Sequence, residues 1–251
     1  MTNKVALVTG SGKRRLGSHV AEALAERGYA LALHYHSSQA DAQRSVEQFQ
    51  EKNVEAIALA ADLRDEGQAR SLVDRTVELF GRIDVVVNAA ATWQRRAFDQ
   101  TTADDLLESF RSNTLGSFVV SQQAGLAMAR QPEGGSIVLI ADWAIERPYV
   151  DHAAYFVSKG SLPTLTRVLA VELAARNPRI RVNCILPGPV MLPPEMSPEE
   201  RAESIRGTLV RHEGRPDNIA QAVLHFIEND FVTGVCLPVD GGRTIRPDSL
   251  S

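Results

Sequence analysis

Two residues of the chain, Tyr155 and Lys159, are spaced so that they can act together in proton transfer. They lie four residues apart in a segment with helical periodicity, so their side chains are expected on one face of a helix. A free tyrosine titrates at about 10 and is a poor acid–base group at neutral pH. A neighbouring ammonium, together with an oxidised and positively charged cofactor, favours the phenolate, so we predict that the two bring the pKa of Tyr155 towards the working range.

A carboxylate, Asp142, lies thirteen positions before Tyr155, where a site that reduces carbonyl groups would place a serine. A serine hydroxyl can donate a hydrogen bond to a carbonyl oxygen, whereas an ionised carboxylate can only accept one. Asp142 therefore predicts a substrate with N–H donors or with ring nitrogens that take up protons. The alternative interpretation is a solvated acid at a strand end. Asn113, in the helix predicted before that strand, could hold the helix and a water in a proton relay.

A glycine-rich segment, Thr9–Gly17, follows the first predicted strand and opens the first predicted helix. Its glycines permit a tight turn and a close approach of the backbone to a pyrophosphate, whose charge a helix N-terminus favours. The same segment contains three consecutive cations, Lys13, Arg14 and Arg15, which a simple turn does not explain. We therefore predict a dinucleotide site here.

The end of the second predicted strand, Ala30–Tyr35, indicates which dinucleotide binds. An NAD enzyme usually has an acid near this point to hold the ribose 2′-hydroxyl. Here His36, Ser37 and Ser38 follow the strand, and no acid occurs before Asp41. These side chains, with a cation of the glycine loop, can neutralise and hydrogen-bond a 2′-phosphate, so we predict NADP(H) as the cofactor.

Short apolar or β-branched runs alternate with segments of helical periodicity along all 251 residues, without repeats or linkers. This alternation predicts one α/β domain, residues 1–251, with a parallel sheet between two layers of helices. The predicted strands are Val5–Thr9, Ala30–Tyr35, Glu55–Ala60, Asp84–Val87, Ser136–Ile140, Arg179–Ile185 and Val235–Pro238.

Composition excludes several classes of function. The net charge is −4 and no basic stripe occurs, so nucleic-acid binding is not expected. No apolar stretch is long enough to span a bilayer, and the N-terminus leads directly into a strand without a signal peptide, so we expect a cytoplasmic protein. Cys184 and Cys236 lie in apolar runs and are expected to be free thiols, not a disulfide or a metal site.

Two proline features are less regular. Pro187–Pro198 contains five prolines and leads into Ser197–Glu200, a sequence typical of a capped helix start, so it could be a flap over the site or a surface crossover. Pro163 is expected inside the helix that carries the catalytic pair, where a proline removes a backbone hydrogen bond and produces a kink.

Together these motifs resemble the short-chain dehydrogenase/reductase family over essentially the whole chain. The matching segments are Thr9–Gly17, Asp62–Leu63, Asn88–Ala90, Asn113, Tyr155-x-x-x-Lys159, Arg181–Asn183, Pro187–Gly188 and Val239–Gly242. The resemblance implies a Rossmann-type, doubly wound, parallel sheet of seven strands, a homotetramer, and catalysis by Asn113, Tyr155 and Lys159. The implied cofactor-binding residues are Gly10, Lys13, Arg14, Arg15, Leu16, His36, Ser37, Ser38, Asp62, Leu63, Asn88, Ala89, Ala90, Ile140, Tyr155, Lys159, Pro187, Gly188 and Val190.

Within that family, the turn Lys13–Gly17, the segment Leu33–Ser37 and Asp142 look like the pteridine reductases. Bacterial dihydromonapterin or dihydrofolate reductases of the family are also similar, in the segments Asp142–Trp143, Glu146–Arg147, Phe231–Gly234 and Asp240–Arg243. The resemblance implies NADPH-dependent reduction of a C=N bond in a dihydropterin, with hydride from the nicotinamide and a proton from Tyr155. Trp93 would stack the pterin ring against the nicotinamide.

By the same resemblance, Asp142 and Tyr155 would contact the substrate, and Arg15 would touch both the cofactor phosphates and the pterin. Two departures from the family pattern are a glycine loop one residue longer and Ala89 in place of an asparagine. The alternatives are a reductase of a ketone, 3-oxoacyl or sugar carbonyl, and an NADP-binding sensor without turnover. For Trp93, the alternative is a core or lid tryptophan.

Overall fold

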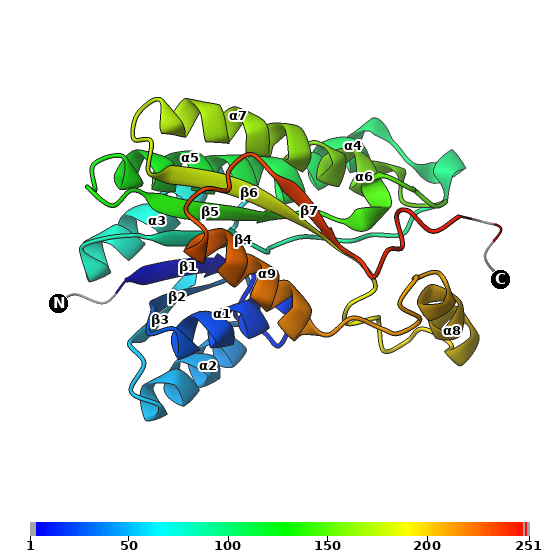
Figure 1. Ribbon diagram of the computed structural model, residues 1–251, viewed down its shortest axis with the longest axis horizontal. Helices are drawn as coiled ribbons and strands as arrows, with labels where there is room; N and C mark the ends of the chain where they lie inside the picture. The colour runs from blue at the N-terminus through cyan, green and yellow to red at the C-terminus, as the bar shows by residue number, and fades with distance from the viewer. Residues whose placement is uncertain (1–3, 248, 250–251) are drawn as a thin grey trace.

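The computed structural model describes residues 4–247 and 249 and contains one sheet of seven parallel strands (Figure 1). The strand order, β3-β2-β1-β4-β5-β6-β7, runs in opposite directions from β1, which confirms the predicted doubly wound, single-domain Rossmann-type fold. Residues Met1–Asn3, on which the absence of a signal peptide was argued, lie outside the described residues. The strands are β1 (Val5–Thr9), β2 (Ala30–Tyr35), β3 (Ala56–Ala60), β4 (Val85–Asn88), β5 (Gly135–Ile140), β6 (Ile180–Pro187) and β7 (Cys236–Val239).

Helices cover both faces of this sheet, with α1, α2 and α9 on one side and α3, α5 and α7 on the other (Figure 1). The right-handed crossovers of parallel strands require this arrangement. The helices are α1 (Leu16–Glu26), α2 (Gln39–Glu51), α3 (Glu66–Phe80), α4 (Ala103–Phe110), α5 (Gly116–Met128), α6 (Ala153–Gly160), α7 (Leu162–Ala174), α8 (Pro198–Arg206) and α9 (Pro216–Glu228). Three short turns, η1 (Phe98–Gln100), η2 (Arg111–Leu115) and η3 (Trp143–Ile145), complete the elements.

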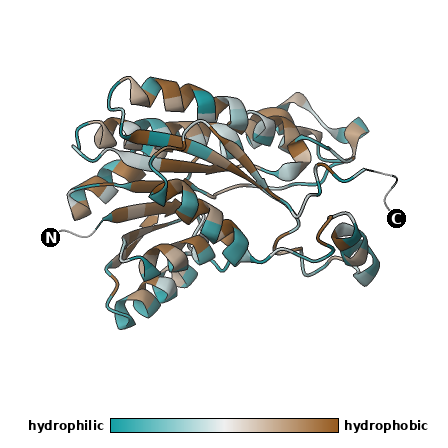
Figure 2. Ribbon diagram, viewed as in Figure 1, coloured by the Kyte–Doolittle hydropathy of each residue, from teal (hydrophilic) through white to brown (hydrophobic). Residues whose placement is uncertain are grey.

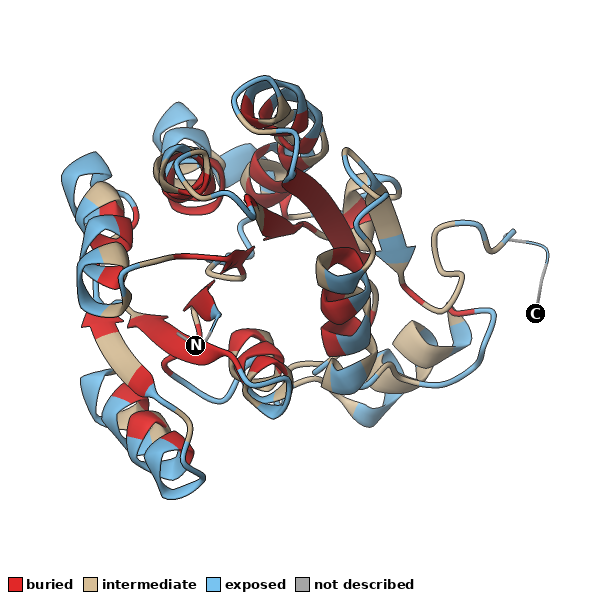
Figure 3. Cartoon of the chain, turned by 60° about the vertical axis from the view of Figure 1, so that its left-hand side comes forward, coloured by how far each residue is buried: buried red, intermediate tan, exposed pale blue. Residues whose placement is uncertain are grey.

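The core has two layers because successive side chains of a strand point to opposite faces. In β1, Leu7 packs into the layer under α3, α5 and α7, whereas Val8 packs into the layer under α1 and α9. Both side chains are fully buried. The strands are accordingly hydrophobic in Figure 2 and mostly buried in Figure 3, while the outer helix faces are hydrophilic and exposed.

The catalytic helix is shorter than the sequence predicts. Helix α6 ends at Gly160, and Pro163 is the second residue of α7, with Ser161 between the two helices. The prediction of a proline inside the helix was therefore wrong. In the first turn of a helix the backbone N–H has no intrahelical partner, so Pro163 removes no hydrogen bond there.

Helix α8 confirms the predicted capped start. The Ser197 hydroxyl accepts from the Glu200 N–H at 3.2 Å, the Glu200 carboxylate accepts from the Ser197 N–H at 2.9 Å, and Pro198 is the first helical residue. Figure 1 shows α8 beyond the carboxyl ends of the strands, apart from the two helix layers. Whether the proline-rich segment before α8 moves over a ligand stays a prediction.

Candidate active site

The structure brings Asp142 and Tyr155 into direct contact. Asp142 follows β5 and Tyr155 lies on α6, and the Tyr155 hydroxyl donates to Oδ2 of Asp142 at 2.8 Å. The other oxygen, Oδ1, accepts from the Ala144 N–H at 2.8 Å, so the carboxylate also caps η3. This contact makes a solvated strand-end acid a poor description of Asp142, because its side chain is hydrogen-bonded on both oxygens.

Burial dominates the electrostatics of this pair. It raises the pKa of Tyr155, and the neighbouring Asp142 raises it further. The predicted lowering of the Tyr155 pKa, by Lys159 together with the oxidised cofactor, stays a prediction, because the side chains alone shift this pKa the other way. Burial also raises the pKa of Asp142. Hydrogen bonds from the Ala144 N–H and from Tyr155, and the charge of Lys159, lower this pKa, but burial is the largest effect. Tyr155 is thus held as a neutral phenol beside a carboxyl group that takes up a proton more readily than an exposed aspartate.

Lys159 is buried and its ammonium donates to the main-chain carbonyl of Ile140 at 2.7 Å. Burial lowers the pKa of Lys159 to about 8, although the charge of Asp142 opposes this shift. Ile140, a predicted cofactor contact, therefore anchors the lysine through its backbone.

Asn113 has a positioning role in the structure. It lies in the π-helical turn η2, where its side chain accepts from the Thr92 N–H at 2.9 Å and donates to the Thr92 carbonyl at 3.1 Å. It also donates to the Ser158 hydroxyl at 2.9 Å. Among the described contacts, none joins Asn113 directly to Tyr155 or Lys159, so the proton relay through a water stays a prediction.

The glycine loop approaches the end of β4 closely. Gly10 has a positive φ of 68°, and a Cβ there would lie 2.8 Å from the Cα of Ala90, so only glycine fits. The Thr9 hydroxyl accepts from the N–H groups of Ala89 and Ala90 at 3.0 and 3.1 Å. The Asn88 side chain donates to the Ser121 hydroxyl at 2.9 Å and keeps its buried carbonyl oxygen without a partner.

A buried histidine, His34, holds the glycine loop, and sequence reasoning did not give it a role. Its Nδ1 accepts from the Gly10 N–H at 3.0 Å, and its Nε2 lies 3.0 Å from the Ala61 carbonyl. Only the tautomer with the proton on Nε2 makes both bonds. Burial lowers the pKa of His34, which keeps this neutral form. The sequence offered one sign of this role, namely a polar residue, His34, inside an otherwise apolar strand.

The cations of the glycine loop fit a dinucleotide. Lys13, Arg14 and Arg15 are exposed, and Arg15 is the residue that precedes Leu16 at the start of α1. The N-terminus of α1 thus faces a loop whose side chains carry three positive charges, the arrangement that binds phosphate groups elsewhere.

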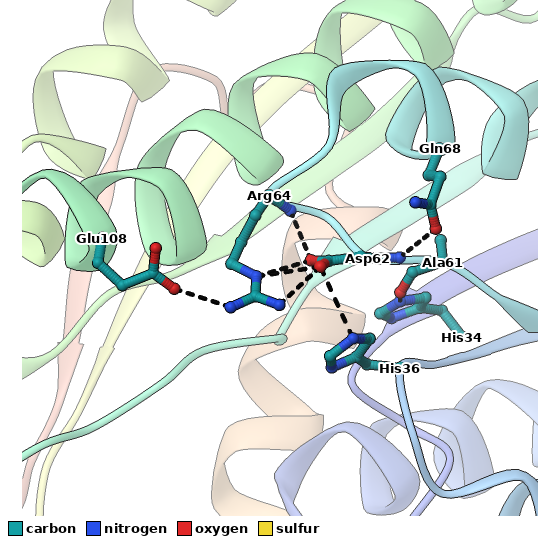
Figure 4. Close-up of polar contacts among 7 residues, drawn as sticks. All are labelled: His34, His36, Ala61, Asp62, Arg64, Gln68 and Glu108. Atoms are coloured by element: carbon teal, nitrogen blue, oxygen red, sulfur yellow. Dashed lines mark hydrogen bonds and ion pairs between the residues drawn. The ribbon is translucent and has the colours of Figure 1, made fainter.

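His36, one of the predicted 2′-phosphate residues, lies beside a charge cluster (Figure 4). Asp62 accepts from the Arg64 guanidinium at 2.7 Å, which lowers the pKa of Asp62 to about 2, and Asp62 lies 3.7 Å from Nε2 of His36. Arg64 also pairs with Glu108 at 2.8 Å. The Asp62 charge is therefore largely compensated by Arg64.

At the start of α2, the hydroxyl of Ser38 caps no helix N–H and lies next to exposed Ser37. These two hydroxyls and the N-terminus of α2 suit an anion at the end of β2.

The remaining predicted cofactor residues lie at the ends of β3 and β6. Leu63 is buried, and its backbone would collide with any side chain at Gly116 at the start of α5. Gly188 follows Pro187 at the end of β6, and its N–H donates to the Val239 carbonyl at 3.0 Å. Val190 forms an isolated parallel bridge with Gly214.

Trp93 is half exposed and belongs to an aromatic cluster that sequence reasoning missed. Its ring stacks on His152 with centroids 4.7 Å apart, and Tyr149 meets His152 and Phe156 edge-on at 4.9 and 4.8 Å. Nε2 of His152 is buried without a hydrogen-bond partner. The spacing of Tyr149, His152 and Tyr155 in the sequence was an available signal for this cluster.

Three further observations concern sites of other kinds. Cys184 and Cys236 are free thiols, as predicted. Among residues 4–247 and 249, no cluster of histidine, cysteine, aspartate and glutamate side chains has the arrangement of a metal site. In the same part of the chain, no helix combines the length and apolar character needed to cross a membrane.

Comparison with known proteins gives matches over nearly the full length. The sequence profile of the family described as Enoyl-(Acyl carrier protein) reductase matches residues 11–244. A protein of Streptomyces violaceoruber named "Granaticin polyketide synthase putative ketoacyl reductase 2" is 34% identical over 95% of both chains.

Two solved structures have the same fold at similar identity. Acetoin dehydrogenase from Enterobacter cloacae has a TM-score of 0.89 at 30% identity, covering 100% of this chain and 99% of the other. A blue fluorescent protein from a metagenomic library, in complex with NADPH, has a TM-score of 0.87 at 32% identity, covering 96% and 97%.

Proposed function

Because the chain belongs to the short-chain dehydrogenase/reductase family, we propose that it is an NADP-dependent oxidoreductase that reduces a carbonyl group. The observation that carries this proposal is the buried Tyr155–Asp142 pair at 2.8 Å, next to Lys159, at the carboxyl end of β5. The carbonyl as the reacting group rests on the names of two relatives, a ketoacyl reductase and an acetoin dehydrogenase.

The residues around the pair account for proton delivery. When bound, the nicotinamide supplies the hydride that the carbonyl carbon receives. Tyr155, kept neutral mainly by burial, donates the proton to the carbonyl oxygen. Asp142 has a raised pKa, and in its protonated form it provides the donor that a serine would otherwise provide. Lys159 stabilises the negative charge left on Tyr155 after proton transfer.

NADP as the cofactor is supported by the end of β2. His36, Ser37 and Ser38 offer hydrogen-bond donors there, and Asp41, the first acid after the strand, is paired with Arg44. A 2′-phosphate would meet no unpaired carboxylate among these residues. One neighbour of the same fold was solved with NADPH.

A second candidate is reduction of a pterin C=N bond, and Asp142 is the observation that favours it. An ionised Asp142 accepts hydrogen bonds from ring N–H groups, and it repels the alkoxide that forms from a carbonyl. The half-exposed ring of Trp93, held by His152, offers a stacking surface for a flat heterocycle. The relatives reported above carry no pteridine in their names.

Assembly and location stay predictions. Apolar side chains are exposed on α4, at Leu107 and Phe110, and on α7, at Val168 and Val171. Such faces suit contacts between copies of the chain, in line with the predicted homotetramer. We also propose a cytoplasmic location.

A sensor without turnover is disfavoured because Tyr155 and Lys159 are intact.

The experiment is NADPH consumption with a panel of 3-oxoacyl thioesters, hydroxyketones, sugars and dihydropterins. The proposal expects turnover of at least one carbonyl class, and Tyr155→Phe serves as the control for contaminating reductases. Turnover of dihydropterins alone would select the second candidate. No turnover with tight NADPH binding would select the sensor.

A further inference from the structure

A cavity of about 560 Å³ lies against the segment that follows Asp142, and half of the residues that line it are arginines. Its wall includes Trp143, which directly follows Asp142, and Tyr149, whose pKa is raised by burial and then by the charge of Asp142. The lining residues are Trp143, Arg147, Pro148, Tyr149, Glu203, Arg206, Gly207, Arg211, Arg243 and Arg246.

Three separate segments bring these arginines together. They come from the loop after β5, from the end of α8 with the residues that follow it, and from the segment after β7. The chain as a whole has a net charge of −4, so a general excess of basic residues does not explain the cluster. Among the described lining residues, Glu203 is the only acid.

Arg243 is fixed in this wall by packing and by one backbone contact. Its guanidinium lies 4.4 Å from the ring centre of Trp143, and its Nη1 donates to the Ser204 carbonyl. It passes so close to Gly207 that a Cβ there would overlap the guanidinium. Its buried Nε has no hydrogen-bond partner. Burial lowers the pKa of Arg243, yet a guanidinium stays protonated in proteins, so a positive charge is held here.

The neighbouring arginines are held by backbone carbonyls as well. Arg147 donates to the Arg246 carbonyl at 2.6 Å, and Arg211 donates to the Arg206 carbonyl at 3.0 Å. Nε of Arg246, like that of Arg243, is buried without a partner. For Arg243, the Ser204 carbonyl orients the guanidinium but does not neutralise its charge. Arg147 and Arg246 also repel Arg243, which lowers the pKa of Arg243 further.

We infer that this cavity binds a multiply charged oxyanion tail of the substrate, a phosphate ester or a group of carboxylates. Guanidinium groups match such oxyanions in charge and in planar, two-bond geometry. A volume of about 560 Å³ accommodates part of a small molecule. The inference deepens the proposed function and rests on it in one respect, namely that the ligand of the cavity is the molecule reduced at Tyr155.

Anion binding is tested first, without turnover. The protein is first saturated with NADPH, which keeps other anions out of the cofactor site. It is then titrated in a calorimeter with inorganic pyrophosphate and with citrate. We expect binding that Arg243→Gln and Arg246→Gln each weaken about tenfold or more. Gly207→Ala keeps every charge but displaces the Arg243 guanidinium, so it should weaken binding too. Arg75→Gln, on the exposed side of α3, is the control for loss of one positive charge and should have no effect.

Stronger binding of pyrophosphate identifies a phosphate ester as the tail, and stronger binding of citrate identifies carboxylates. Equal binding to wild type, Arg243→Gln and Arg246→Gln, or no binding at all, overturns the inference.

Selectivity is tested second, with pairs of carbonyl or dihydropterin substrates that differ only in an anionic tail. Wild type should prefer the charged member by about tenfold or more in kcat/KM. Arg243→Gln should reduce this preference mainly through KM. Anion binding without such a preference overturns the assignment of the tail to the substrate. Anion binding in a protein that reduces no substrate at all instead contradicts the proposed function and leaves the anion site standing.

Discussion

Replacing Asp142 by serine should change activity in opposite directions for the two substrate classes. In the structure the Asp142 carboxyl accepts from Tyr155 and from the Ala144 N–H, both at 2.8 Å. For a carbonyl substrate, the protonated acid is the useful form, because the ionised form donates no hydrogen bond. Burial raises the pKa of Asp142, so this form is present below the raised pKa and is lost as the pH rises through it.

The magnitudes follow from the hydrogen bonds that are gained or lost. One donor to a developing oxyanion contributes about 2.7–4 kcal/mol, or about 10²–10³-fold. The ratio of kcat/KM for Asp142→Ser over wild type should therefore rise with pH to at least about tenfold with a carbonyl substrate. With a dihydropterin, serine loses a charge-assisted acceptor of about 1.5–3 kcal/mol. Activity on the dihydropterin should therefore fall by about tenfold or more.

The assay is NADPH consumption across a pH series for both proteins and both substrates. A ratio of rates removes the titrations that the two proteins share. The titration of Lys159 is not among them, because Asp142 raises the Lys159 pKa, so the ratio is taken below the pH at which Lys159 titrates in Asp142→Ser. Asp65→Ser is a matched control, because Asp65 caps α3 through the Gln68 N–H at 2.9 Å, far from Tyr155. A ratio near one at every pH for both substrates would show that Asp142 only caps η3, and the reasoning from its chemistry would be refuted.

Three further predictions concern the cofactor, the aromatic cluster and the lysine. NADPH should bind at least about tenfold more tightly than NADH in a fluorescence titration, since a 2′-phosphate finds donors at His36 and Ser38; equal affinities would contradict this. Trp93→Ala should raise KM about tenfold for a flat heterocyclic substrate without changing NADPH affinity, whereas an unchanged KM would exclude stacking. In Asp142→Ser, kcat should fall with rising pH at a pH below about 8, because burial lowers the pKa of Lys159 to about 8 in wild type and the variant lacks the Asp142 charge that opposes this shift. A flat profile would remove Lys159 from the mechanism.

The seven strands were predictable because each is a short apolar run between segments of different periodicity. Their ends were predicted less well, since pairing with a neighbour decides where a strand stops. Asn88 belongs to β4 because it pairs with Thr9 and Leu139, and β6 extends to Pro187 because it pairs with Val239. No local sequence signal carries that information.

The meeting of Asp142, Tyr155 and Lys159 was also predictable, because motifs at the carboxyl ends of parallel strands gather at one edge of a sheet. The direction of the Tyr155 pKa was not, because it depends on burial and on which oxygen the hydroxyl contacts. The arginine-lined cavity could not be predicted from the sequence either. Arg147 contacts the backbone of Arg246, a residue far along the chain, and neither lies in a recognisable motif.

The central claim is that a hydride passes from NADPH to a carbonyl carbon and that Tyr155 donates the accompanying proton to the carbonyl oxygen. The direct measurement uses NADPH in which both hydrogens at the reactive nicotinamide carbon are replaced by deuterium, and it follows the label by mass spectrometry of the reduced product. Wild type should transfer one deuterium to each product molecule, and Tyr155→Phe should bind NADPH with nearly unchanged affinity but transfer at least about a hundredfold more slowly. Transfer at the wild-type rate in Tyr155→Phe, or product without the label, would contradict the account.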